Sequence, residues 1–289
     1  MGTSGAYGGS GSGSWGAARD AVIDIPADVG ASGAATPGGS DVFDDAVADA
    51  AAAIADAMVA EEPGLGRAPS EYPISNLLPQ THVAGGGGGG GGGRGSGTGA
   101  GRTRGASRTG GRTGGSSRRN MTAGAQRGGL ALGAAYALRN RDGAGLAAVG
   151  LDLAALEALP PAGRVSRILD VILGPATHPD EQVLREAAVE QVKSIVMGEV
   201  PPTIPDAIRA FVATYVWKMG MLELRAQYPD GLPAADVLLK RERELRNYIR
   251  ARIRSVTVPA ATAATDLKAE AARVLGDVLR VLRAGRAAA

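Results

Sequence analysis

The sequence contains no cysteine among its 289 residues. This absence excludes disulfide bonds, thiolate zinc sites and cysteine nucleophiles, and it is compatible with a reducing compartment, so we expect a cytoplasmic protein. Aromatic residues are also scarce, at 3%. The N-terminus lacks the basic and apolar regions of a signal peptide, and no apolar run approaches the length that crosses a bilayer, so we expect no membrane insertion.

Motifs that carry catalysis or bind metals are missing as well. The two histidines, His82 and His178, have no acidic partner at metal-ligand spacing, and no glycine-rich loop is followed by Lys-Ser or Lys-Thr. Residues 9–13 match the letters of a hydrolase nucleophile elbow but have no strand-to-helix context. We therefore expect a non-enzymatic protein with no catalytic residue, no cofactor and no metal.

Glycine, in contrast, is abundant and unevenly placed. Most of the 45 glycines precede residue 130, and nine of them form an unbroken run from Gly85 to Gly93. Glycine loses the most backbone entropy on ordering and has no side chain to bury, so this run cannot belong to a packed domain. The pattern predicts a flexible Gly/Arg-rich linker over residues 85–119 and one folded domain over residues 120–284.

Charge is segregated along the first part of the chain. Residues 1–84 contain two cations and eleven acids, a net charge of −9, whereas residues 85–119 contain seven arginines and no acid, a net charge of +7. The Arg-Thr-Gly units in this basic block are similar to Arg-Gly segments that bind RNA, but no aromatic ring is present to stack on bases. A linker is the favoured interpretation, and contact with nucleic acid is the alternative.

The region before the linker divides into two parts. Residues 1–39 show no apolar period, which predicts a disordered N-terminal tail. Residues 40–84 are acidic and begin with Ser40 followed by carboxylates, a pattern that starts a helix. Apolar residues then recur at helical spacing up to Pro63, and a proline-rich stretch predicts extended chain. The short helix either docks on the C-terminal domain or recognises a partner.

The C-terminal part predicts an all-α helical bundle. Glycines weaken the first turns of the segment after Asn120, Gly174 followed by Pro175 stops a later helix, and the capping box Thr177-His178-Pro179-Asp180 begins the next one. Pro205 begins the helix expected at the centre of the core, because apolar residues cover both of its sides. These are Ile208, Phe211, Val212, Tyr215, Trp217, Met219, Met221, Leu222 and Leu224.

The two last helices are amphipathic. The segment from about Pro233 to Val256 has an apolar stripe, and the segment from about Thr265 to Ala284 has another. Basic residues gather on the opposite side of the first of these helices: Lys240, Arg243, Arg246, Arg250 and Arg254. Such a face contacts phosphates in nucleic-acid-binding proteins but is more often only solvated, and both interpretations stay open.

Several segments together resemble the QatB family of the Qat anti-phage defence system. They are the start Met1-Gly2-Thr3-Ser4 with its Gly/Ser tail, the stretches 167–172 and 179–187, and the stretch 245–256. The resemblance implies a non-enzymatic component of a bacterial defence operon. It also implies partners from that operon: an ATPase, a QueC-like enzyme similar to the 7-cyano-7-deazaguanine synthase, and a TatD-like nuclease.

The resemblance further implies a role for Gly2. In systems of this kind the QueC-like enzyme is thought to attach a deazaguanine to the N-terminal glycine of a partner, so Gly2 is the candidate modified residue once Met1 is removed. Two other functions are compatible with the sequence. One is a nucleic-acid-binding adaptor that uses the Arg-Thr-Gly segment and the basic helix face, and the other is a scaffold for the ATPase.

Overall fold

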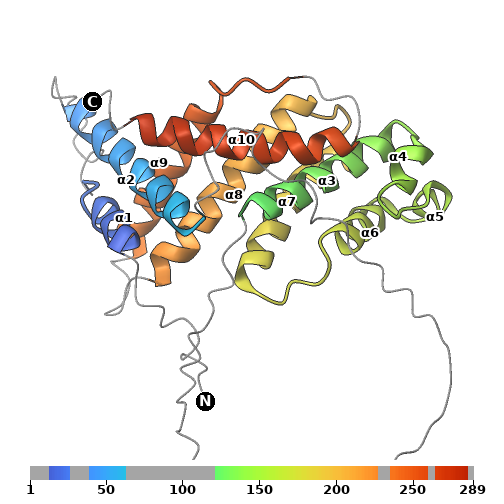
Figure 1. Ribbon diagram of the computed structural model, residues 1–289, viewed down its shortest axis with the longest axis horizontal. Coiled ribbons are helices and arrows are strands. Elements are labelled where there is room, and N and C mark those ends of the chain that lie inside the picture. The colour runs from blue at the N-terminus through green and yellow to red at the C-terminus, as the bar shows by residue number, and fades with distance from the viewer. Residues whose placement is uncertain (1–12, 27–38, 63–120, 227–234, 260–263, 286–289) are drawn as a thin grey trace, which may run out of the picture.

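The computed structural model describes residues 13–26, 39–62, 121–226, 235–259 and 264–285 (Figure 1). These ranges contain ten helices and no strand, which confirms the predicted all-α class for them. The helices are α1 (Gly13–Ile23), α2 (Gly39–Glu61), α3 (Met121–Arg139), α4 (Gly143–Ala147), α5 (Leu153–Glu157), α6 (Pro161–Ile172), α7 (Pro179–Met197), α8 (Ile204–Ala226), α9 (Ala235–Ile253) and α10 (Ala264–Ala284).

The C-terminal helix α10 runs along the length of the bundle and connects its two ends (Figure 1). It packs most extensively against α3, and it also contacts α2, α8 and α9. Helix α7 packs between α3 and α8, whereas α4, α5 and α6 lie at the end opposite to α1 and α2. The last helix in sequence is therefore the element that joins the first helices to the rest of the core.

The predicted central helix, α8, is confirmed as part of the core. Ile208, Phe211 and Val212 are each 0% exposed, and the rings of Phe211 and Tyr215 stack with their centroids 5.8 Å apart. Trp217, on the other side of this helix, is only partly buried. Apolar residues on both sides of a helix predict burial between neighbours, and α8 has such neighbours in α3, α7 and α9.

Close packing explains why glycines occur in α3 although their helix propensity is low. A Cβ atom added at Gly128 would overlap the ring of Phe211, and one added at Gly129 would overlap the backbone of Leu267 in α10. Glycine at these two positions lets the backbone of α3 approach α8 and α10 at once. Each glycine lowers the stability of the helix by about 1 kcal/mol relative to alanine, and the close packing that it permits in the core offsets this loss.

The stop signal lies where the sequence predicts it, whereas the capping box at the start of α7 is shifted by one residue, to His178 and Glu181 instead of Thr177 and Asp180. Gly174 adopts a left-handed φ of +74° directly after α6. The carboxylate of Glu181 accepts hydrogen bonds from the backbone N–H of Thr177, at 2.8 Å, and of His178, at 3.3 Å, at the start of α7. These bonds to the carboxylate hold the pKa of Glu181 below its usual value. Both signals depend only on neighbouring residues, which is why the sequence reveals them.

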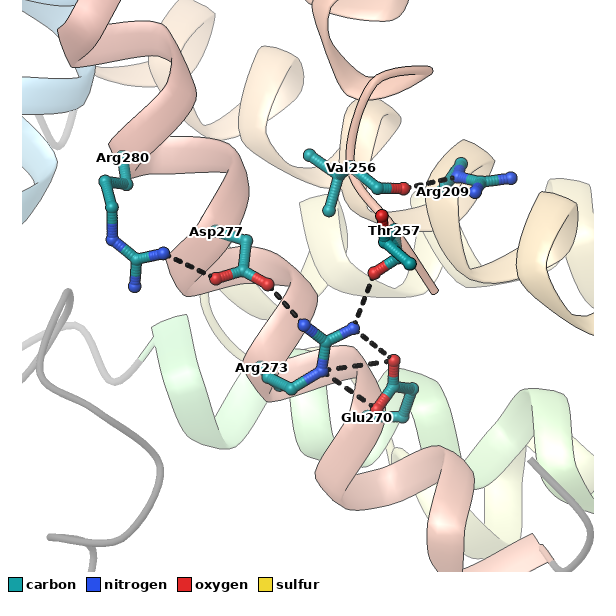
Figure 2. Close-up of polar contacts among 7 residues, drawn as sticks. All are labelled: Arg209, Val256, Thr257, Glu270, Arg273, Asp277 and Arg280. Atoms are coloured by element: carbon teal, nitrogen blue, oxygen red, sulfur yellow. Dashed lines mark hydrogen bonds and ion pairs between the residues drawn. The ribbon is translucent and has the colours of Figure 1, made fainter. Parts of the chain in front are cut away.

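The connection between α9 and α10 is held by arginines (Figure 2). Arg273 of α10 donates to the backbone oxygen of Thr257 at 2.8 Å and forms ion pairs with Glu270 and Asp277 on its own helix. Arg209 of α8 donates to the oxygen of the adjacent Val256 at 3.0 Å. These bonds satisfy carbonyl groups of a non-helical segment and fix it between α8 and α10.

Two segments before the predicted domain of residues 120–284 are part of the core. For the second of them, the sequence left open whether its helix docks on the domain or recognises a partner. Residues 1–39 were predicted to be disordered, yet Gly13–Ile23 forms α1, and Trp15 is 2% exposed and belongs to the central apolar cluster. The helix expected in residues 40–84 is α2, and it docks on the bundle, where it contacts α9 and α10 and buries Ile54. The core thus contains helices that precede the Gly/Arg-rich segment in the sequence as well as helices that follow it.

Candidate functional site

Gly2, the predicted site of modification, lies outside the described residues, so the structure bears on it through the point where the described chain begins. We call residues 1–12 the N-terminal arm. Helix α1 follows it at Gly13 and is fixed against α2 by buried side chains: Trp15, Ala18, Val22 and Ile25. The arm therefore starts from a fixed position on the bundle.

The spacing of these four buried residues is the signal that sequence reasoning missed. They recur at intervals of three and four residues, which places them on one side of a helix. Serines and glycines around the stretch obscured the pattern, and Ala18 is a weak apolar marker by itself. The correction is that residues 13–26 do have a helical apolar period.

A hydrogen bond fixes the start of α1 to the end of α2. The indole Nε1 of Trp15 donates to Oε1 of Glu61 at 2.7 Å. Arg241 of α9 donates from Nε to the backbone oxygen of Ile25 at 2.9 Å, just beyond the other end of α1. Since both ends of this short helix are bonded to other elements, its orientation on the bundle is defined.

Glu62 connects the same place to α3. Its carboxylate accepts a hydrogen bond from the backbone N–H of Met121 at 2.7 Å, and from that of Thr122 at 3.3 Å. Burial raises the pKa of the Glu62 carboxyl above its usual value, although the hydrogen bonds from Thr122 and Met121 oppose the increase. The carboxylate thereby occupies the N-terminus of α3, where free N–H groups and the helix dipole favour a negative charge.

Three chain boundaries consequently lie together. The arm enters α1 next to Glu61, and the segment 63–120 leaves α2 at Glu62 and returns to α3 next to the same side chain. The predicted linker, residues 85–119, and the proline-rich stretch before it fall inside this segment, outside the described residues. We refer to the meeting point of Trp15, Glu61, Glu62 and Met121 as the arm root.

The side of α1 that faces away from the bundle is exposed. Ala17, Asp20, Ile23 and Asp24 are its exposed residues, and Ile23 is 40% exposed. On this helix Arg19 forms an ion pair with the adjacent Asp20 at 2.7 Å, in which the side chain of Asp20 is 61% exposed. We call these four exposed residues the outward face of α1. Two of them carry carboxylates.

The predicted basic face on α9 is partly preserved. Arg243 and Arg250 are exposed on one side of α9, and the exposed Arg254 follows directly after the last residue of this helix, whereas Lys240 and Arg246 are half-buried. The guanidinium of Arg246 lies over the ring of Trp217, 4.8 Å from its centroid. Arg246 is therefore engaged with α8 by a cation–π interaction, and three of the five predicted residues face the solvent.

The electrostatics of this basic face are mixed. Burial and the nearby Arg246 lower the pKa of Arg250, while Glu190 of α7 acts in the opposite direction. Arg225 of α8 forms an ion pair at 2.8 Å with Glu242, a buried acid on α9. Arg250 thus lies near an acidic side chain, which dilutes its attraction for phosphate.

A groove of about 490 Å³ separates the first half of α2 from α9. Its lining includes Phe43, Glu244, Asn247, Tyr248 and Arg252, and Nε of Arg252 donates to the Tyr248 hydroxyl at 2.9 Å.

Within the described ranges no group of three or more His, Cys, Asp or Glu side chains is arranged to hold a metal ion. No described helix is long and apolar enough to span a bilayer.

The described part of the chain is a helical bundle with a partly basic helix face, and residues 1–12 join it at the start of α1. Comparison with protein families gives a match over residues 110–282, more than half of the chain, to the model described as Qat anti-phage system associated protein QatB. The chain belongs to this family and is thus a component of an anti-phage defence system. Neither a curated protein nor a solved structure matches it. Helices α1 and α2 lie outside the matched range.

Proposed function

We propose that this chain serves the Qat system as an acceptor protein, and that the amine of Gly2 receives a deazaguanine from a QueC-like enzyme of the same operon. The observation that carries the proposal is the anchoring of α1 by the buried Trp15 and its bond to Glu61. This anchoring leaves an arm of twelve residues without any charged side chain before the first fixed residue. Such an arm is suited to present an amine to an enzyme's active site.

The composition of the arm supports the same role. Gly2 has no side chain, and Thr3 and Ser4 are small, so the amine is open to a narrow site. A small second residue also favours removal of Met1, which exposes the amine. The arm offers few apolar groups to bury, with Tyr7 its only aromatic residue, so threading it into an active site disrupts no packed core.

The proposed reaction forms an amide bond between the Gly2 nitrogen and a carboxyl carbon on the deazaguanine. A free carboxylate does not react with an amine, so we assign its activation to ATP as the co-reactant. The bond between the α- and β-phosphates breaks, pyrophosphate leaves, and the carboxylate becomes an acyl adenylate. The amine then attacks the acyl carbon, AMP leaves with the bonding electrons, and a base takes the proton of the amine.

In this proposal the chain is a substrate and not the enzyme. The QueC-like protein supplies the chemistry in the cytoplasm, where ATP is available. The ATPase and the TatD-like nuclease of the operon act with the modified chain. The helical bundle contributes the fixed base from which the arm is presented.

The decisive experiment is the mass of the N-terminal peptide of this chain after expression with its operon neighbours and after expression alone. The expected result is an adduct on Gly2 only in the first case, and none in the Gly2→Leu variant. An unmodified Gly2 in cells that are protected against phage would overturn the proposal.

A second candidate function is an adaptor that binds nucleic acid through the basic face of α9. The observation in its favour is the exposure of Arg243 and Arg250 on one side of the helix and of Arg254 directly after its end. The neighbouring Glu190 and Glu244 weaken this candidate relative to the first. Binding that falls steeply with salt concentration would support it.

A further inference from the structure

The position of the arm root limits where a modifying enzyme can act. Gly2 is separated from Gly13, the first residue of α1, by eleven Cα–Cα steps, so a fully extended arm spans about 40 Å and a flexible one averages about 20 Å. Part of this length has to enter the active site. The entrance of that site therefore has to lie close to α1 when the reaction occurs.

This limit on the position of the enzyme is strict because α1, from which the arm extends, is held rigidly on the bundle. If residues 1–39 were a free tail, an enzyme could act far from the bundle. The buried Trp15, Val22 and Ile25, with the bonds to Glu61 and Arg241, fix α1 instead. An enzyme that reaches Gly2 along the arm consequently acts near α1, and the outward face is the exposed side of that helix.

The charges near the arm favour the same surface. The arm itself has no charged side chain, so the first charged side chains along the sequence are Arg19, Asp20 and Asp24, and in space Glu61 lies beside the start of α1. Asp20 and Asp24 lie on the outward face, and Arg19 is paired with Asp20. An enzyme that binds ATP and a carboxylated base requires a positively charged entrance, which complements this acidic surface.

Ile23 adds an apolar group to this face. Its side chain is 40% exposed although most large apolar residues of the described bundle are buried. An apolar group surrounded by charges is the usual composition of the centre and rim of a protein–protein contact. The outward face thus combines position, charge and an apolar contact.

We propose that the outward face of α1, formed by Ala17, Asp20, Ile23 and Asp24, is the docking surface for the enzyme that modifies Gly2. This inference rests on the proposed function and specifies where the partner binds. Docking orients the enzyme so that the entrance of its active site faces the arm. The length of the arm then allows the Gly2 amine to reach that active site. The enzyme would thus recognise two separate parts of this chain, the outward face of α1 and the acceptor Gly2.

A charge-reversal pair tests the surface. The variant Asp20→Lys/Asp24→Lys is expected to reduce the rate of Gly2 modification by the QueC-like enzyme at least ten-fold, measured from the intact mass over time. The matched control is Asp44→Lys/Asp45→Lys, which has the same charge change at two exposed residues of α2. These residues lie about 25 Å along α2 from Glu61, so the control is expected to be modified like the parent chain.

An arm-length variant separates docking from reach. Deletion of residues 8–12 leaves a maximal span of about 20 Å, so it is expected to abolish modification while the enzyme still binds with the Kd of the parent. Binding is measured with Gly2→Leu as the unmodifiable reference. In this background Asp20→Lys/Asp24→Lys is expected to raise the Kd at least ten-fold, and circular dichroism checks that both variants keep the helical fold.

Each outcome distinguishes the two proposals. Normal modification and binding in the α1 variant would overturn the docking surface and leave Gly2 as the acceptor. Equal losses in the α1 variant and the α2 control would also overturn it, because the effect would then be one of net charge. Absence of any adduct on the parent chain would overturn the proposed function together with this inference.

Discussion

The carboxylate of Glu62 accepts a hydrogen bond from the backbone N–H of Met121 at 2.7 Å, although the two residues are 59 positions apart. The end of α2 thereby caps the start of α3. The described chain therefore ends at Glu62 and resumes at Met121 at one place on the bundle. The predicted linker does not separate a free tail from the folded domain.

Removal of this cap should destabilise the protein. Glu62→Ala leaves the N–H groups of Met121 and Thr122 without their acceptor and should lower the free energy of unfolding by about 1–2 kcal/mol. Urea unfolding followed by circular dichroism measures the change. Glu181→Ala, which removes an exposed cap of α7, is the matched control and should cost less than Glu62→Ala.

The Glu62 carboxyl should also give a characteristic pH dependence. Because its pKa is raised in the folded state above the unfolded value of 4.5, the folded state binds the proton more tightly. The stability that this proton contributes is complete below the unfolded pKa and is lost as the pH rises through the folded pKa. The free energy of unfolding of the parent relative to Glu62→Gln should therefore decrease from pH 4 to pH 7. An increase over that range would contradict the assigned direction.

The bond between Trp15 and Glu61 should stabilise the docking of α1. Trp15→Phe keeps an aromatic ring in the core but removes the indole donor, so we expect a loss of about 1 kcal/mol. Trp15→Ala also removes a large buried side chain and should cost about 3–5 kcal/mol. Hydrogen exchange at α1 reports the local effect, and equal protection in the parent and Trp15→Ala would show that α1 is not held by this residue.

Cleavage of the Gly/Arg-rich segment should leave the two parts of the chain associated. Trypsin is expected to cut between Arg94 and Arg119, and α2 remains packed on α9 and α10 in the cleaved protein. Size-exclusion chromatography should then give one peak in native buffer and two peaks in urea. Two peaks in native buffer would show that the contact of α2 with the bundle is weak.

The close approach of α3 to α8 should make Gly128 intolerant of any side chain. Gly128→Ala should lower stability by about 1–3 kcal/mol because the new methyl group overlaps the Phe211 ring. Gly276→Ala in α10 is the control: nothing lies within 4 Å of its added Cβ, so it should stabilise by about 0.5–1 kcal/mol. Gly128→Ala combined with Phe211→Leu should be less destabilised than the sum of the single changes.

The basic face should contribute little to stability. Replacing Arg243, Arg250 and Arg254 with Gln should change the free energy of unfolding by less than about 1 kcal/mol for each residue, since they are exposed. Fluorescence anisotropy with labelled single-stranded nucleic acid at two salt concentrations tests the adaptor function. A tight complex that loses affinity in the triple variant would favour the adaptor over the acceptor function.

The positions of the later helices could be predicted from sequence because their signals are local. Gly174, the apolar stripe of α9 and the capping box of α7, which was predicted one residue too early, depend on residues within one or two turns of each other. Helix α1 carries the same kind of signal in Trp15, Val22 and Ile25, but glycine and serine around it led to a prediction of disorder. The resemblance to the QatB family also came from sequence and agrees with the family match.

The candidate site was predicted less completely. Five basic residues were expected on one side of α9, and Arg243, Arg250 and Arg254 are exposed there or directly after its end. That Arg246 covers Trp217 could not be read from the spacing, because the ring belongs to another helix. Gly2 was proposed from the family-like start, whereas the fixed position from which its arm extends came only from the packing of α1.

The sequence by itself determined that this chain is helical, where most of its helices begin and end, and which side of each helix is apolar, because helix periodicity and capping act over a few residues. Tertiary structure alone decided that α1 and α2 join the core, that Glu62 caps α3 although 59 positions separate Glu62 from Met121, and that Gly128 and Gly129 let three helices approach closely. Each of these depends on which surfaces meet in space, and the physical reason is that burial and hydrogen bonding join residues regardless of their separation along the chain.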